Sequence, residues 1–291
     1  MTINTLLAGA LNGFFLGGLY ATVAISLSLV FGVMRLVNVT HGEYLIAAAY
    51  LNIVITSALG IDPLISTFIS IPILFVVGYA LQRWVLNPVM NKGMEPALLM
   101  AFGLSIIAQN GLIRVFGGDS KTITTQFSQR GMEVFGITVP TIYVVSLFIG
   151  IILIGGLHLF INRSFLGKAI RAATQDPETA GVMGINVNVI YAITYAIGAT
   201  LASFGGLLIG TAFSFVPSTG FYWLLKSFVV VVLGGMGSIV GTLAGGLILG
   251  TTEGIGAAFV GTGYRDMIGF LIFLLMLLVR PRGLFGQKGS E

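Results

Sequence analysis

The chain has 291 residues, of which 56% are hydrophobic and only 8% are charged, and its formal net charge is +4. Soluble globular domains carry about 25% charged residues, so this composition excludes an ordinary soluble fold and predicts an integral membrane protein. The sequence has no cysteine, which excludes a disulfide framework and a thiolate metal site.

Apolar runs separated by short polar breaks follow one another along the chain. They do not alternate as the strands of a membrane barrel do, so we expect helices. The expected helices cover residues 6–33, 41–59, 63–86, 95–116, 138–161, 186–214, 222–236, 238–258 and 264–280. The sequence therefore predicts an all-α polytopic helical bundle of about eight or nine membrane helices, forming a single domain over residues 1–291.

Basic residues indicate the orientation of the bundle, because Lys and Arg concentrate in cytoplasmic loops. With the N-terminus outside, nine basic residues fall on the inner side: Arg35, Arg83, Lys92, Arg163, Lys168, Arg171, Arg280, Arg282 and Lys288. Five fall on the outer side: Arg114, Lys121, Arg130, Lys226 and Arg265. This bias predicts an outside N-terminus and a cytoplasmic C-terminus. No basic region precedes the first apolar stretch, so no cleaved signal peptide is expected.

The segment 222–258 leaves the number of crossings open. Its first apolar piece has only about 15 residues, or roughly 22 Å of helix, against a hydrocarbon core of about 30 Å. Gly234, Gly235 and Gly237 separate it from the next piece, so the pair forms either two full crossings or a re-entrant hairpin. Broken backbone at membrane depth is tolerated only against protein or a water-filled cavity. These three glycines are therefore candidates for a translocation pathway.

Glycine is about twice as frequent as usual, with 41 residues against a typical share of about 7%. Gly241 and Gly245 lie four residues apart, and so do Gly246 and Gly250. Small residues at this spacing share a helix face and let two helices approach closely. We therefore expect a helix that is packed tightly on two sides. The alternative is that smooth glycine faces let helices slide during gating.

Glu253 is the clearest charged residue inside a predicted helix. Charges within membrane spans are costly and therefore informative. Three interpretations stay open for Glu253: a structural hydrogen bond to a neighbouring helix, a position that lines the pathway together with Tyr20, and proton coupling. Lys226 is expected at the membrane interface.

A polar cluster at residues 38–43 separates the first two predicted helices. Thr40 and Glu43 have the spacing of a capping box, in which the threonine caps the helix and the glutamate reaches back. His41, beside this cap, is expected to be structural. The alternative is that Asn38, His41 and Glu43 line the inner mouth of the pathway.

The largest inner loop predicts a cytoplasmic helix-turn-helix at about residues 163–185. Asp176 is a good N-cap, Pro177 suits the first helical position, and Gly184 can end the second helix. An ordered, charged projection of this kind is suited to docking on another protein. The sequence has no G-x-x-x-x-G-K-[ST] phosphate loop, so a motor that uses ATP has to be a partner, and we do not expect an enzyme.

The inner loop resembles the coupling region of branched-chain amino-acid ABC importer permeases of the LivH type. The residues that carry the likeness, and that are expected to couple the chain to an ATPase, are Gly167, Lys168, Ala169, Arg171, Ala172, Asp176, Pro177, Glu178, Ala180, Gly184 and Ile185. Matching stretches also occur, in order, at 32–43, 233–246 and 280–286. One departure is Val39-Thr40, where relatives more often have an aromatic residue and alanine, so a hydroxyl is added to the pathway lining.

The resemblance implies a permease subunit that imports branched-chain or other neutral amino acids across the bacterial or archaeal cytoplasmic membrane. It also implies a second homologous permease, two cytoplasmic ATP-binding subunits that use ATP and Mg, and an extracytoplasmic substrate-binding protein. No cofactor, metal or nucleic acid is expected on this chain. Three alternatives stay open: a permease for urea or short amides, a stand-alone ion-coupled carrier or channel, and a scaffold that transports nothing.

Overall fold

A computed structural model describes residues 3–125, 128, 130–281 and 283–286. Nine helices in this part of the chain are long and apolar enough to cross a membrane, in agreement with the predicted all-α polytopic bundle. Arg282 and Lys288, two of the basic residues counted above, lie outside the described residues.

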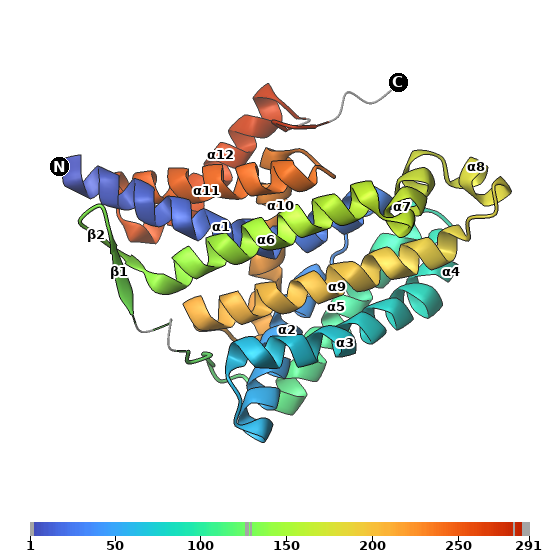
Figure 1. Ribbon diagram of the computed structural model, residues 1–291, viewed down its shortest axis with the longest axis horizontal. Helices are drawn as coiled ribbons and strands as arrows, with labels where there is room; N and C mark the ends of the chain where they lie inside the picture. The colour runs from blue at the N-terminus through green and yellow to red at the C-terminus, as the bar shows by residue number, and fades with distance from the viewer. Residues whose placement is uncertain (1–2, 126–127, 129, 282, 287–291) are drawn as a thin grey trace.

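The elements follow one another with short connections (Figure 1). They are α1 (Ile3–Met34), α2 (His41–Leu59), α3 (Pro63–Leu81) with a π-helical extension (Gln82–Leu86), α4 (Asn87–Met90), α5 (Met94–Phe116), β1 (Gly131–Val134), β2 (Ile137–Pro140), α6 (Thr141–Arg163), α7 (Phe165–Gln175), α8 (Pro177–Val182), α9 (Val187–Ala212), α10 (Gly220–Gly234), α11 (Ile239–Val260) and α12 (Arg265–Val279).

The β1–β2 hairpin is the main departure from the predicted elements. Gly131 pairs with Pro140, and the antiparallel ladder continues to Val134 and Ile137. The expected helix from residue 138 therefore begins only at Thr141, because the preceding residues are taken up by strand pairing. The turn between the strands consists of Phe135 and Gly136, both with positive φ, as a two-residue hairpin requires.

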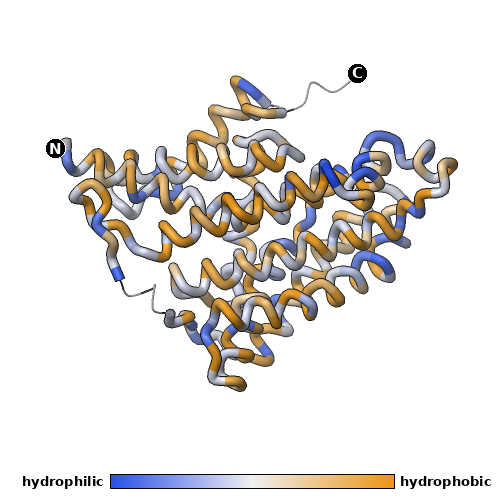
Figure 2. The backbone as a smooth tube through the Cα atoms, in the orientation of Figure 1, coloured by the Kyte–Doolittle hydropathy of each residue, from blue (hydrophilic) through white to orange (hydrophobic). Residues whose placement is uncertain are grey.

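The two ends of the bundle differ in character. The N-terminus and the β1–β2 hairpin lie at one end of the long axis, and α7 and α8 lie at the other (Figure 1). Hydrophilic residues gather around α7 and α8, whereas the long helices between the two ends are mainly hydrophobic (Figure 2). This arrangement agrees with a membrane-embedded middle and a polar projection at one surface.

Helix α1 lies at the centre of the bundle. Every residue from Leu16 to Val30 is buried, against α6, α9, α10 and α11. A helix that is apolar on all sides is stable only where protein or lipid surrounds it. Because four helices surround this stretch of α1, its side chains contact protein. The outer helices, by contrast, keep one face for contact with lipid.

Glycines form the contact between α1 and α11. Along the two helices Gly9 faces Gly254, Gly13 faces Gly250, and Gly17 faces Gly246. A Cβ atom on Gly17 would lie 2.6 Å from the carbonyl oxygen of Gly246, which is closer than atoms can approach. The missing side chains therefore set the distance between the two backbones.

Gly241 and Gly245 lie on another side of α11. A Cβ on Gly241 would overlap the backbone of Gly234, and one on Gly245 would overlap the backbone of Val230 in α10. Helix α11 is thus in close backbone contact with α1 on one side and with α10 on the other.

Candidate functional site

Three features of the bundle unite the residues that the sequence singled out: a projection formed by α7 and α8, a polar cluster at the start of α2, and an ion-pair network between α10, α11 and α12. The projection is the most regular of them. Ser164 caps α7 by accepting a hydrogen bond from the Gly167 amide (2.8 Å). Asp176 caps α8 by accepting from the amides of Glu178 (3.0 Å) and Thr179 (3.1 Å).

Asp176 is an exposed carboxylate with donors on one side. The hydrogen bond from the Thr179 hydroxyl, followed by the amides of Thr179 and Glu178, lowers the pKa of Asp176 below its ordinary value. Pro177 occupies the first turn of α8, and Gly184 ends the turn after it with φ +86°. The predicted N-cap and the predicted glycine stop are both confirmed.

The projection is anchored on its inner face and open on its outer face. Gly167 packs directly on the carbonyl groups of Phe160 and Ile161, and Ile170 and Ala173 are buried. Arg171 donates a hydrogen bond to Asn162 (2.7 Å), which ties α7 to the end of α6. The exposed part of the projection is therefore held rigidly on the bundle.

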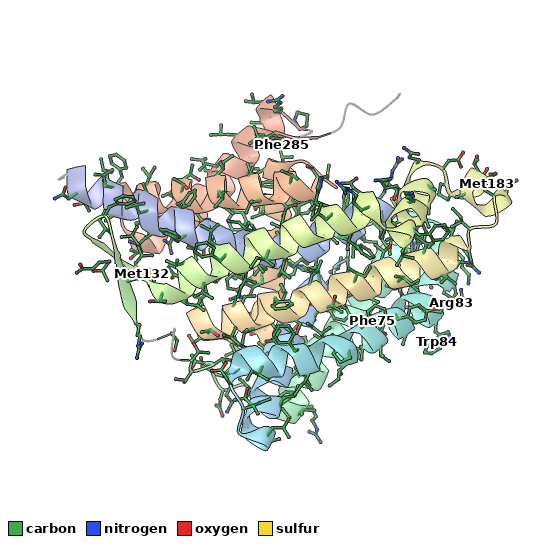
Figure 3. The ribbon with its side chains drawn as sticks, in the orientation of Figure 1. Phe75, Arg83, Trp84, Met132, Met183 and Phe285 are labelled. Carbon is green, nitrogen blue, oxygen red and sulfur yellow. The ribbon has the colours of Figure 1, made fainter. Side chains whose placement is uncertain are left out.

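Sequence reasoning missed the apolar residues of this projection. The side chains of Phe165 and Val182 are each 88% exposed, and that of Met183 is 78% exposed. Met183 points outward from the far end of the bundle (Figure 3). Lys168, Glu178 and Gly181 are exposed on the same projection. The signal that could have found the apolar tip is the run Val182-Met183 directly before the glycine stop.

His41 is the centre of the buried polar cluster. One ring nitrogen, Nδ1, lies 3.1 Å from the hydroxyl of Ser26 in α1, and the other, Nε2, lies 3.2 Å from the hydroxyl of Ser227 in α10. The ring is buried, and the backbone of Val23 provides a further hydrogen-bond partner. His41 thus joins three helices through one side chain.

The predicted capping box at the start of α2 is wrong. Thr40 has helical backbone angles and its side chain caps nothing, because a helical N-cap turns the hydroxyl away from the free amides. Asn38 makes the contact expected of Glu43: its Oδ1 accepts from the Thr40 amide (3.1 Å) and also from the Tyr195 hydroxyl (3.2 Å). Glu43 is released from the cap and is buried.

A small pocket lies beside this cluster. Its water-accessible volume is about 10 Å³, close to that of one water molecule. Polar side chains from α1, α2, α9 and the loop before α2 line it: Ser26, Asn38, His41, Tyr44 and Tyr195. Val30 of α1 and the small residues Gly198, Ala199 and Ala202 of α9 complete the wall, so the lining is partly polar and partly apolar.

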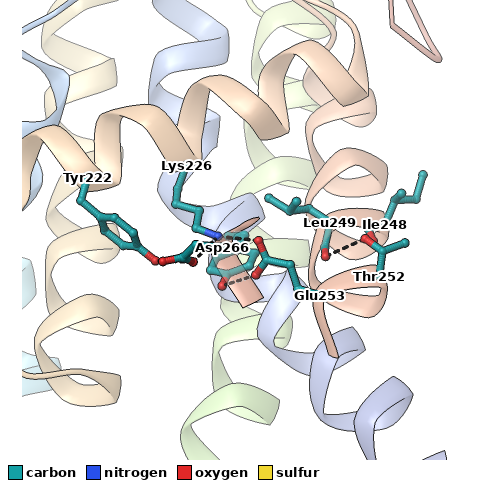
Figure 4. Close-up of polar contacts among 8 residues, drawn as sticks. Tyr222, Lys226, Ile248, Leu249, Thr252, Glu253 and Asp266 are labelled. Carbon is teal, nitrogen blue, oxygen red and sulfur yellow. Dashed lines mark hydrogen bonds and ion pairs between the residues drawn. The ribbon is translucent and has the colours of Figure 1, made fainter. Parts of the chain in front are cut away.

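Lys226, which the sequence predicts at the membrane interface, is buried by protein and forms a polar network with residues of neighbouring helices (Figure 4). It pairs with Glu253 of α11 and with Asp266 of α12, the latter at 2.8 Å. The Tyr20 hydroxyl of α1 donates to Glu253 (2.8 Å), and the Tyr222 hydroxyl donates to Asp266 (3.1 Å). The two ion pairs of this lysine offset the free energy that is lost when its charge is removed from water.

The break between α10 and α11 is filled with backbone. Gly235 and Gly237 have φ of +99° and +82°, and Gly237 lies against Gly32 of α1. The segment after α12 returns to this break, where the Leu284 and Phe285 amides donate to carbonyls at the end of α10, at 3.0 and 3.1 Å. The glycines that the sequence marked as pathway candidates are thus closely packed.

The sequence matches the family described as the branched-chain amino acid transport system permease component over residues 9–280. The chain belongs to this permease family. The permease is 34% identical to the high-affinity branched-chain amino acid transport system permease protein LivH of Escherichia coli K12, over 96% of this chain and 95% of that protein. Identity to the permease protein BraD of Pseudomonas aeruginosa is also 34%, with the same coverage.

The likeness extends to archaea. The permease is 30% identical to the probable branched-chain amino acid transport permease protein LivH of Methanocaldococcus jannaschii, over 92% of this chain and 89% of that protein. No solved structure matches the chain. Family membership and the nine apolar helices among the described residues make this permease a multi-pass protein of the cytoplasmic membrane.

The candidate residues of this permease fall into separate places. Asn38, His41 and Glu43 lie together at the start of α2. Tyr20 and Glu253 belong to the Lys226 network, and its further members Asp266 and Tyr222 were not predicted from the sequence. In the described part of the chain no group of His, Cys, Asp or Glu could hold a metal ion.

Proposed function

We propose that this permease is the membrane subunit of an ATP-driven importer for branched-chain amino acids. The observation that carries the proposal is 34% identity over 96% of the chain to LivH and BraD, whose names specify high-affinity branched-chain amino acid transport. The proposal includes a second homologous permease, two cytoplasmic ATPase subunits that bind ATP and Mg, and an extracytoplasmic binding protein. The permease itself carries out no chemical step.

The α7–α8 projection is the proposed docking site for the ATPase. It is an ordered, capped projection with an exposed apolar tip at Val182 and Met183. Apolar anchors surrounded by charge are typical of the central part of a protein interface. Its rigid attachment through Gly167 and Arg171 allows a push on the tip to reach α6 and α9. ATP binding would move the projection, open the bundle outward and admit solute, and hydrolysis would reset it.

The proposed pathway passes the polar cluster at the start of α2. Asn38, His41 and Glu43 are supported by the small pocket beside them, whose polar groups come from several helices. Tyr20 and Glu253 are proposed to fix α1, α10, α11 and α12 around that path, because their polar groups are already paired. Gly234, Gly235 and Gly237 are proposed to keep the inner end of these helices closely packed.

The test is transport by the assembled complex in proteoliposomes, with ATP inside and the binding protein outside. We expect uptake of L-leucine that requires ATP, the ATPase subunits and the binding protein. The permease alone should show no leucine flux. Robust flux without ATP would support the stand-alone carrier or channel instead. ATP-dependent uptake of urea, with no leucine uptake, would support the short-amide permease.

A further inference from the structure

Glu43 is a buried acid without a counter-charge. Its side chain is 3% exposed, and in the described part of the chain it takes part in no ion pair and its Oε2 atom has no hydrogen-bond donor. The other buried acid, Glu253, is paired with Lys226 and Tyr20. An ionisable residue in a membrane span is costly, and one that is left without a counter-charge is a candidate for binding.

The described residues around Glu43 have small side chains and include no cation. The backbones of Gly42 and Gly220 are in direct contact, and a Cβ on Gly220 would lie 3.0 Å from Glu43 Oε1. The hydroxyl of Ser105 in α5 and the backbone amide of Glu43 itself donate hydrogen bonds to the carboxyl group, and neither carries a charge. The cluster around His41 offers no base to Glu43, since both ring nitrogens of the histidine already face serine hydroxyls.

Helix α5 forms a thin cover over this carboxylate. The residues of α5 that are buried are all small, namely Ala97, Ala101 and Ser105. Phe102 and Ile107 of α5 point away from the bundle and are more than half exposed, whereas Leu104, Leu112 and Phe116 pack against the core. The part of α5 that meets Glu43 at Ser105 therefore contributes small side chains.

We infer that the carboxylate of Glu43 receives the α-ammonium group of the amino acid during its passage. This inference rests on the proposed function and adds the chemistry that recognises the solute. A zwitterion leaves water only if its charges find partners in the low-dielectric interior. Oε2 of Glu43 is the one carboxyl oxygen without a hydrogen-bond partner among the buried acids of the described chain, and it belongs to the polar cluster through which the pathway is proposed to run.

The first experiment compares Glu43→Gln with Glu43→Asp in the reconstituted complex. Gln keeps the size of the side chain and removes the charge, so we expect L-leucine uptake to fall more than about tenfold, which corresponds to about 1.4 kcal/mol. Asp keeps the charge and should retain part of the uptake. ATP hydrolysis stimulated by the loaded binding protein should stay within about twofold of wild type, because Glu43 is remote from the ATPase. The matched control is Glu95→Gln, an exposed acid of α5, which should change nothing.

A second experiment uses the wild-type complex, so it does not depend on a variant that folds. Dicyclohexylcarbodiimide, which reacts with carboxyl groups in apolar surroundings, should label Glu43 as read by peptide mass. L-leucine should slow this labelling, and 4-methylpentanoate, the same skeleton without the ammonium group, should not.

Equal protection by both compounds, or by neither, would overturn the inference, as would full leucine uptake by Glu43→Gln. A parallel loss of uptake, ATP hydrolysis and leucine protection would assign Glu43 a structural role and also overturn it. A wild-type complex that takes up no leucine at all would instead refute the proposed function, and the inference would fall with it.

Discussion

The ion-pair partners of Lys226 determine where its side chain lies. It lies 27 residues before Glu253 in the sequence, yet the two form one ion pair in the interior, and Asp266 joins them from α12. The side chain of Glu253 is fully buried, whereas that of Asp266 is 48% exposed. The pair with Glu253 is therefore the strong one, because solvent screens the other.

Replacement of Lys226 by methionine tests this ranking. Lys226→Met leaves Glu253 as an unpaired buried carboxylate, so we expect a loss of about 3–5 kcal/mol in the free energy of unfolding. Adding Glu253→Gln should recover most of it, since a neutral amide still accepts from Tyr20. Thermal unfolding of the purified permease in detergent measures both. Losses that add in the double variant would contradict the ion pair.

The hydrogen bonds of Asp176 predict how the stability of the α7–α8 projection depends on pH. Its pKa is lowered by hydrogen bonds from Thr179 and Glu178, so the folded projection favours the charged form. The stabilisation is complete above the ordinary pKa of aspartate and is lost as the pH falls through the lowered value, so the cap is intact at neutral pH. Asp176→Ala should raise hydrogen exchange at the amides of Glu178 and Thr179, measured by mass spectrometry. Asp176→Asn should not, because asparagine caps helices nearly as well; equal exchange in both variants would contradict the cap.

At the scale of the elements, the contact between α1 and α11 depends on the absence of side chains at the facing glycines. Three glycine pairs face one another along two antiparallel helices, and no side chain separates the backbones. The glycine spacing in the sequence indicates such a contact, since residues four apart share a face. The glycine spacing does not indicate which helix lies opposite. In the structure this face of α11 contacts the long central helix α1.

A glycine substitution measures this contact directly. Alanine has the higher helix propensity, so Gly250→Ala would stabilise an isolated helix. In the bundle its Cβ overlaps the backbone of Gly13, so we expect a destabilisation of about 1–3 kcal/mol, read as a lower melting temperature in detergent. The matched control is Gly156→Ala in α6, which has open space and should be neutral or slightly stabilising. Equal melting temperatures for the two variants would refute tight packing of α11 on α1.

At the scale of the whole molecule, the proposed importer is divided between a rigid apolar bundle and one polar end. The α7–α8 projection lies at the end opposite the N-terminus, with its apolar tip exposed (Figures 1 and 3). A large exposed apolar group outside the apolar middle of a membrane protein is costly unless a partner covers it. The exposed tip therefore supports the proposal that a partner subunit docks on this projection.

Val182→Ser combined with Met183→Ser removes the apolar tip. We expect a loss of co-purifying ATPase and of ATP-dependent leucine uptake, with the permease itself inserted and folded as judged by its melting temperature. Arg171→Glu should reduce coupling as well, because it removes the bond to Asn162 and reverses a charge. Met132→Ser on the hairpin at the opposite end is the control and should assemble normally. Unchanged uptake in the tip variant would refute docking at this site.

The sequence by itself determined the all-α membrane architecture, the positions of the apolar helices, and the Asp176 cap and Gly184 stop of α8. Each of these follows from local chemistry: helix length against bilayer thickness, and a cap residue against amides two or three positions away. The expected start of α6, at residue 138, was three residues early, because strand pairing between 131–134 and 137–140 competed with the helix.

Only the tertiary structure decided where the buried polar groups go. Asn38 instead of Glu43 accepts the amide of Thr40 at the start of α2, Lys226 is buried beside Glu253 and Asp266, and Glu43 is left without a counter-charge. These outcomes depend on side chains from other helices, which lie 27 to 233 positions away along the chain in the Glu253 network. A charge is stable in an apolar bundle only beside its partner, and spacing along one helix carries no information about which partner that is.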